Sequence, residues 1–163
     1  MKLGQQVEWG LHAAAMMTSL PEGSTLPASR MAEYCGVPAA YLAKALQDMA
    51  RAGIVTATPG RSGGYRLARR PEDVSLLDVV DAIEGGEPIF RCTEITRNMP
   101  VPRDDDAPTS RCAIASAMDR AERAWRSELD GVSLADLRRR LERTLPLPVR
   151  RASQAWIEAA ARS

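Results

Sequence analysis

The chain has 163 residues, of which 45% are hydrophobic and 26% charged, and its formal net charge is only +1. This composition is ordinary for a globular protein and argues against a polycation that binds nucleic acid by charge alone. No run of about 18 apolar residues occurs, so no transmembrane helix is expected. Glu8 and His12 stand where a signal peptide would need an apolar stretch, so we expect a cytoplasmic protein with no membrane partner.

Three helices are expected in the first third of the chain. Apolar residues at helical spacing, with Pro or Gly near the ends of the segments, predict helices over residues 5–19, 27–35 and 39–53. The second and third of these segments are separated only by the tight turn Gly36-Val37-Pro38. A short helix, a turn and another helix in succession are typical of a helix-turn-helix.

A β-hairpin follows directly. The β-branched stretch IVTATPG (54–60) predicts a strand, RSGG a turn, and YRLARR (65–70) a returning strand. The hairpin carries four arginines and no acidic residue: Arg61, Arg66, Arg69 and Arg70. A basic hairpin behind a helix-turn-helix is typical of a DNA-binding wing. The alternative is a solvated hairpin whose arginines serve solubility.

The second half of the chain predicts more helices, over 74–84 with Ser75 as N-cap, from Cys112 onward, and after Ser133. The tail after a Pro-x-Pro sequence either forms a last amphipathic helix or frays. We therefore expect a DNA-binding domain over 1–72, and a connecting helix, a loop (86–111) and further helices over 73–144. A C-terminal tail over 145–163 completes the chain.

Two segments carry a resemblance to a known family: YLAKALQDMARAGIV (41–55) and RSGGYRLARRPEDVSLLDVVDAIEG (61–85). They resemble the winged-helix regulators of the Rrf family, which includes IscR, NsrR and RsrR. The resemblance covers about residues 1–140, and VEWGLH (7–12) and CTEI (92–95) are most similar to the RsrR branch. It implies a mainly α fold, a winged helix-turn-helix with a two-stranded β wing and a long dimerisation helix after Cys112. It also implies a homodimer whose DNA binding is switched by an iron–sulfur cluster.

The DNA-reading residues follow from this arrangement. The third helix is expected to enter the major groove of double-stranded DNA, and two copies are expected to read a pseudo-palindromic operator. Side chains that can donate to bases or phosphates, small residues that permit close approach, and the glycine turn of the wing are the candidates. They are Ser29, Ala39, Ala40, Tyr41, Lys44, Gln47, Arg61, Ser62, Gly63, Gly64 and Tyr65.

The cofactor expectation depends on three cysteines. The best-known members of the family place three cysteines in the loop, whereas this loop has only Cys92 and Cys112. The remaining candidates are Cys35, Glu8 and His12. We expect Cys92, Cys112, Cys35 and Glu8 to ligate a [2Fe–2S] cluster across the dimer, with His12 as a further cofactor-binding residue. Trp9, beside Glu8, is the expected switch that transmits the cluster state to the DNA-binding unit.

Other interpretations stay open at this stage. Cys35 can be a small buried hydrophobe, Glu8 a solvated charge, and His12 a packed residue. A cluster-free regulator switched by a thiol–disulfide pair is the main alternative, and a structural Cys₃His zinc site is another. The run Asp104–Asp106 is interpreted as a solvated loop. The chain has no P-loop, no dinucleotide fingerprint and only one histidine, so neither an enzyme nor a small-molecule substrate is expected.

Overall fold

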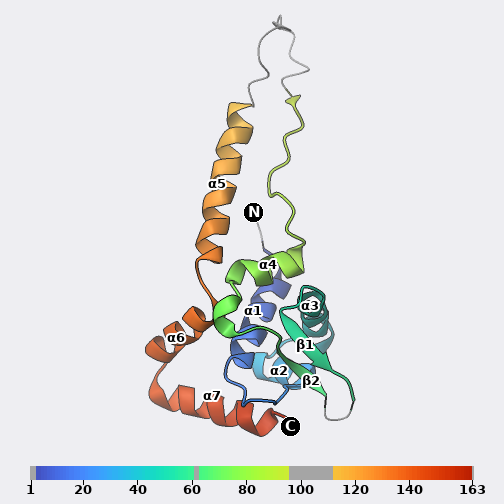
Figure 1. Ribbon diagram of the computed structural model, residues 1–163, viewed down its shortest axis with the longest axis vertical. Coiled ribbons are helices and arrows are strands. Elements are labelled where there is room, and N and C mark those ends of the chain that lie inside the picture. The colour runs from blue at the N-terminus through green and yellow to red at the C-terminus, as the bar shows by residue number, and fades with distance from the viewer. Residues whose placement is uncertain (1–2, 61–62, 96–111, 163) are drawn as a thin grey trace, which may run out of the picture.

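The structure is a computed structural model that describes residues 3–60, 63–95 and 112–162. It is mainly helical, with an antiparallel β-hairpin, as the sequence predicts (Figure 1). In chain order the elements are α1 (Gln5–Met17), α2 (Ala28–Cys35), α3 (Ala39–Arg51), β1 (Val55–Thr58), β2 (Gly64–Leu67), the short 3₁₀ helix η1 (Pro71–Asp73), α4 (Leu76–Glu84), α5 (Ala113–Asp130), α6 (Leu134–Thr144) and α7 (Leu147–Ala160). No helix in this described part of the chain is both long and apolar enough to cross a membrane.

The hydrophobic core gathers around α1, which packs against α3 and α4. From α3 the core receives Leu42, Leu46 and Met49, all fully buried, at the spacing that the sequence predicts for one helical stripe. Gly10 lets α1 approach α4 closely, because a Cβ added there would lie 2.5 Å from Cδ1 of Ile83. The buried stripe fixes which side of α3 faces outward.

The wing is a small sheet with additions at its edge. Val55 lies opposite Leu67 and Thr58 opposite Gly64 in the β1–β2 hairpin. Outside the hairpin, Leu26 forms an antiparallel bridge with Tyr65, and the neighbouring Thr25 forms one with Arg162. The segment between α1 and α2 and the C-terminal end of the chain therefore lie one after the other beside the wing.

A nearly repeated pentapeptide joins the two halves of the chain. VSLLD (74–78) and VSLAD (132–136) both form a capping box, in which the serine side chain accepts from the backbone N–H of the aspartate three residues later at 3.1 Å. The two segments also pair with each other through two backbone hydrogen bonds of 2.9 Å, Leu76 N–H to Val132 and Leu134 N–H to Val74. The first turns of α4 and α6 are thereby held together.

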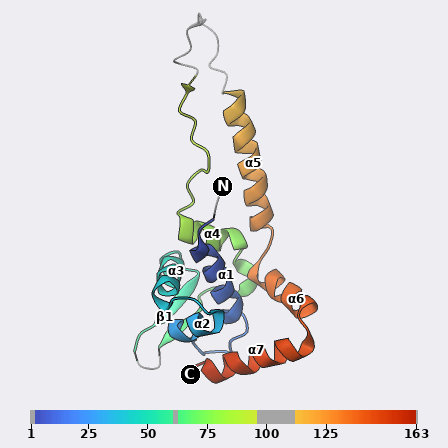
Figure 2. The same cartoon turned by 180° about the vertical axis from the view of Figure 1, so that it is seen from behind.

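Helix α5 extends away from the globular part of the molecule as a stalk, with the segment that follows α4 running beside it (Figures 1 and 2). Its base is held by Arg126, which donates to the carboxylate of Asp81 on α4. Higher up, the backbone N–H of Ile89 donates to Glu122 at 3.2 Å. Among the residues of this helix only Ala115 is buried, so the stalk leaves most of its surface uncovered within one chain.

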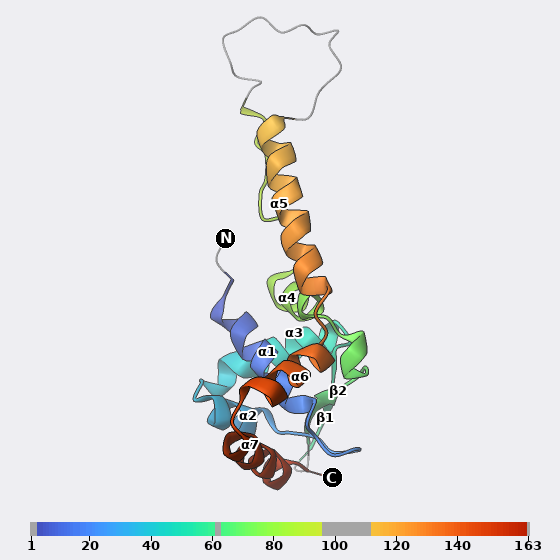
Figure 3. The same cartoon turned by 90° about the vertical axis from the view of Figure 1, so that its left-hand side faces the viewer.

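The tail forms a helix, an outcome that the sequence left open. Helix α7 runs back beneath the globular part, at the end opposite to the stalk (Figure 3). Ile157 and Ala160 are buried and join the main core. The C-terminal segment is therefore packed against the DNA-binding unit.

Candidate nucleic-acid interface and cysteine site

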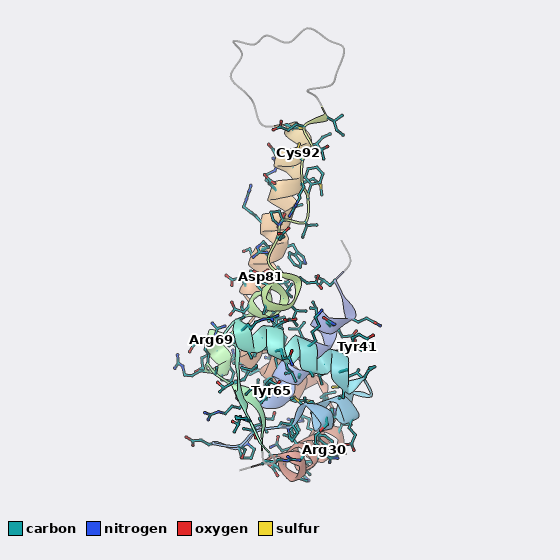
Figure 4. The ribbon with its side chains drawn as sticks, turned by 90° about the vertical axis from the view of Figure 1, so that its right-hand side faces the viewer. Arg30, Tyr41, Tyr65, Arg69, Asp81 and Cys92 are labelled. Atoms are coloured by element: carbon teal, nitrogen blue, oxygen red, sulfur yellow. The ribbon has the colours of Figure 1, made fainter. Side chains whose placement is uncertain are left out.

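The outer face of α3 presents the candidates for base reading. Ala39, Ala40, Tyr41, Lys44 and Gln47 are all exposed, while the opposite face of the helix is buried. Figure 4 shows α3 lying across the front of the molecule with the wing beside it. This combination presents a small, polar and singly charged helical face of the kind that enters a major groove.

Tyr41 links this face to α1. Its side chain is 56% exposed, and its ring centroid lies 6.1 Å from that of Trp9, with the rings tilted by 56°. Trp9, Tyr41, Pro38 and two glutamines of α1, Gln5 and Gln6, line an open cavity of about 560 Å³. The expected switch residue therefore contacts the expected reading helix directly.

The wing arginines divide into two groups. Arg66 is exposed on β2. Arg69 pairs with Asp78 at 3.2 Å, and Arg70 pairs with Asp73 at 2.8 Å, so acidic residues beyond the hairpin occupy both side chains. Sequence reasoning considered the hairpin alone and missed these pairs. Two of the predicted wing contacts, Arg61 and Ser62, lie outside the described residues.

The glycines of the wing turn are required by the packing of the chain itself. A Cβ on Gly63 would lie 2.1 Å from the carbonyl oxygen of Thr58, and one on Gly64 would lie 2.7 Å from the backbone of Leu26. Gly64 is buried and Tyr65 is half-buried. Close backbone approach within the protein thus accounts for both glycines, whatever they contact outside it.

The start of α2 adds a residue that sequence reasoning missed. Ser29 is exposed in the first turn, as a phosphate contact requires. Beside it, Arg30 lies with its guanidinium carbon 4.9 Å from the ring centroid of Trp156 on α7. Only a contact between segments far apart in the chain reveals this arginine, so no local pattern in the sequence identifies it.

Cys92 and Cys112 meet at the start of the stalk helix. Cys112 is the N-cap of α5, and the nearby backbone N–H groups of Ala115 and Ile114 lower the pKa of its thiol, as does the side chain of Cys92. Cys92 is exposed and accepts from the backbone N–H of Glu94 at 3.4 Å. A thiolate at a helix N-terminus is both a better metal ligand and a better nucleophile than an ordinary cysteine.

The other three candidate ligands lie elsewhere. Glu8 and His12 are exposed and stand four residues apart on α1, on one face of the helix. Cys35 is half-buried at the C-terminal end of α2, packed against the core, and burial raises the pKa of its thiol. Cys92 is far from the DNA-binding unit, near the distal end of the stalk (Figure 4). Within the described part of one chain, no three His, Cys, Asp or Glu side chains are grouped as a metal site would need.

Several solved structures resemble this chain in fold. The structure of IscR from T. potens superposes with a TM-score of 0.67 over 90% of this chain and 93% of its own, at 20% identity. CymR (YrzC), described as the global cysteine regulator of B. subtilis, superposes with a TM-score of 0.64 over 85% of this chain and 96% of its own, at 21% identity. These likenesses confirm the mainly α winged-helix fold with its β wing.

The sequence comparisons agree with the fold. YffB from Lactococcus lactis subsp. lactis, described as an HTH-type transcriptional regulator, is 32% identical over 137 residues, which cover 84% of this chain and 86% of that protein. The family model Rrf2, described as iron-dependent transcriptional regulator, matches residues 3–140. This chain therefore belongs to the Rrf2 family of DNA-binding transcriptional regulators, whose members are not enzymes.

Proposed function

We propose that two copies of this chain form a regulator whose affinity for a pseudo-palindromic DNA operator is set by a [2Fe–2S] cluster. The observation that carries the proposal is the meeting of Cys92 and Cys112 at the N-terminus of α5, where the pKa of Cys112 is lowered. Ligation of iron requires deprotonated thiols, and this position favours the thiolate. The pair supplies two of the four protein ligands that a two-iron cluster takes.

We infer that the other two ligands come from a second chain. One chain brings together no third ligand with Cys92 and Cys112 among its described residues. The stalk helix favours pairing, because its exposed residues include Ile114 and Met118, 67% and 39% exposed, besides alanines at positions 113, 117, 121 and 124. Apolar surface of this kind is stabilised by burial against a partner. We therefore infer a homodimer held by α5.

Glu8 and His12 of the partner subunit fit the two open ligand positions best. Both are exposed, and their spacing of four residues places them one helical turn apart. Cys35 fits less well than the sequence suggested, because it packs against the core and its raised pKa disfavours the thiolate. When bound, the cluster supplies a one-electron redox centre, and a carboxylate and an imidazole in place of two thiolates alter its potential.

Trp9 is the proposed link between the cluster and DNA. It lies next to Glu8 in the sequence, and its ring contacts Tyr41 on the reading helix. A change at the ligands on α1 thus has a short path to the DNA-reading face. The residues proposed to contact DNA are those exposed on α3, together with Ser29 and the wing. Half-sites are expected roughly one helical turn apart.

Anaerobic purification tests the cofactor. We expect brown protein with equal iron and sulfide, and colourless protein from Cys92→Ala, Cys112→Ala, Glu8→Ala and His12→Ala variants. Cys35→Ala is the matched control and keeps its colour. Trp9→Ala also keeps its colour, but its DNA affinity no longer differs between the oxidised and reduced cluster. Colourless wild-type protein, prepared anaerobically with iron and sulfide supplied, contradicts the cluster.

A cluster-free thiol switch is a second candidate, which the contact between the Cys92 and Cys112 thiols favours. Loss of two electrons to an oxidant such as a disulfide would join the two sulfurs and release two protons. The two functions give opposite results in one experiment. The switch predicts colourless protein in which mild oxidation forms a reducible Cys92–Cys112 disulfide, found by mass spectrometry of the digested protein, and alters DNA affinity.

A further inference from the structure

Helix α7 contacts α2, the first helix of the helix-turn-helix, through the side chains of Trp156 and Ser153. The ring centroid of Trp156 lies 4.8 Å from that of Tyr34, and the guanidinium carbon of Arg30 lies over the tryptophan ring, 4.9 Å from its centroid. A hydrogen bond of 2.7 Å joins the hydroxyls of Tyr34 and Ser153, one turn before the tryptophan. Aromatic, cationic and polar contacts therefore converge on one face of α2.

The other end of this C-terminal segment pairs with the segment that lies beside the wing sheet. The backbone groups of Arg162 and Thr25 exchange two hydrogen bonds of 2.8 Å. The adjacent residue, Leu26, exchanges two hydrogen bonds of 2.9 Å with Tyr65 of β2. The last residues of the chain are thereby connected to the wing through the segment between α1 and α2.

This segment is anchored to the body of the protein as well. Ile157 and Ala160 are buried in the core, and the amide of Gln154 donates to the carbonyl oxygen of Ser19 at 3.2 Å. The segment lies beyond residue 140, where the match to the family model ends. Its contacts are therefore a feature of this chain, which the family match does not cover.

Helix α2 needs such support. It has only 8 residues, and of these only Met31 and Ala32 are buried. A helix this short is marginal on its own and depends on its neighbours for a fixed orientation. Because α2 packs against α3 in the helix-turn-helix, a shift of α2 changes how α3 and Ser29 can sit on DNA at the same time.

We propose that residues 146–162, the C-terminal arm, position the DNA-reading unit, with Trp156 holding α2 and Arg162 bracing the wing sheet. The arm thereby fixes α2 and the wing relative to each other, so that α3, the start of α2 and the wing engage one operator together. Trp156 is a positioning residue, and Arg30 is the side chain on which it acts most directly. The inference rests on DNA binding by this family and not on the cluster.

The test uses the full-length dimer and a DNA duplex selected from a random-sequence library with the wild-type protein. Trp156→Ala is expected to weaken binding to the selected duplex about tenfold, from the loss of the aromatic and cation–π contacts. Binding to an unselected duplex of the same length is expected to change less than about twofold, because phosphate attraction needs no fixed geometry. Trp156→Phe restores most of the specific affinity.

Two further variants keep the result independent of folding. Tyr34→Phe removes only the hydroxyl that bonds Ser153 and is expected to weaken specific binding about twofold to threefold. Arg151→Ala, on an exposed position of α7, is the control and has no effect beyond a small uniform loss. In the double variant Arg30→Ala/Trp156→Ala, the loss of binding free energy for the selected duplex is expected to be smaller than the sum of the losses in the two single variants.

The contrary outcomes are distinct. Unchanged specific affinity of a folded Trp156→Ala protein overturns the inference. An equal loss on the selected and unselected duplexes, together with a lower melting temperature, assigns Trp156 a stabilising role alone and overturns it too. A wild-type protein that enriches no sequence from the library contradicts DNA reading itself, and this inference with it.

Discussion

Arg126 of α5 donates two hydrogen bonds to the carboxylate of Asp81 on α4, at 3.0 and 2.5 Å, and so links the stalk to the globular unit. Both side chains are about one third exposed. The bidentate geometry fixes the direction in which the stalk leaves α4. This ion pair joins the base of the stalk to the body of the protein.

Replacing Asp81 by Asn tests this tie. We expect the free energy of unfolding to fall by roughly 1 kcal/mol, because a partly exposed bidentate pair is worth little more than a surface pair. Urea unfolding of Asp81→Asn, Arg126→Gln and the double variant measures it. If the loss in the double variant equals the sum of the two single losses, the two side chains do not act as a pair.

The environment of Cys112 predicts an unusually reactive thiol. Because its pKa is lowered while burial raises that of Cys35, Cys112 is a thiolate at a lower pH than Cys35. In cluster-free protein kept under anaerobic conditions, iodoacetamide should modify Cys112 faster than Cys35 at pH 7. Mass spectrometry of quenched digests gives both rates. The midpoint of the rate against pH for Cys112 should move upward in Cys92→Ala, which removes one of the hydrogen bonds.

Lys44 is expected to contribute one phosphate contact. Lys44→Ala should weaken DNA binding and reduce the slope of log affinity against log salt by about one. Fluorescence anisotropy at several salt concentrations gives the slope. Arg140→Ala is the matched control, since α6 lies on the side of the molecule away from α3 (Figures 3 and 4). Equal slopes for wild type and Lys44→Ala would remove this residue from the interface.

The capping box of α6 predicts a pH-dependent stability. A hydrogen bond from the Ser133 hydroxyl, then one from its backbone N–H and one from Arg139, lower the pKa of Asp136 to about 2. A carboxylate whose folded pKa lies below the unfolded value near 3.9 contributes stability above about pH 4 and loses it as the pH falls toward 2. Ser133→Ala removes the first of these bonds. The variant should therefore be less stable at pH 7, with a difference that narrows between pH 4 and pH 2.

Urea unfolding at pH 7, 4 and 2.5 follows that difference. Ser127→Ala, at an exposed position of α5, is the control and should match the wild type at each pH. If the difference in unfolding free energy between wild type and Ser133→Ala stays constant across the three pH values, the serine does not lower the pKa of Asp136.

Local patterns were sufficient for most of the fold. The stripe of Leu42, Leu46 and Met49 predicted α3, and Ser75 and Ser133 predicted the starts of α4 and α6, because periodicity and capping act within a few residues. The tail was not settled by its sequence. Its helix is held by contacts such as that of Trp156 with α2, between segments far apart in the chain, and no local pattern encodes them.

The sequence predicted which residue types belong to the candidate site, but not which of those residues lie near one another. The loop cysteines stood out from composition, and their meeting at a helix N-cap required the structure. Cys35 is a thiol like the other two by composition, and only its packing against the core separates it from them. The pairing of Arg69 with Asp78 likewise lies beyond the hairpin that suggested a free basic wing.

The matched pentapeptides at 74–78 and 132–136 have a topological consequence. The backbone N–H groups of Leu76 and Leu134 each donate to the other pentapeptide. The two ends of the chain between these residues therefore lie side by side. Helix α4 itself packs on α1 and α3, so within this stretch it is α5 that extends from the body. The two pentapeptides therefore fix where the stalk is attached to the body, independently of the length of chain that lies between α4 and α5.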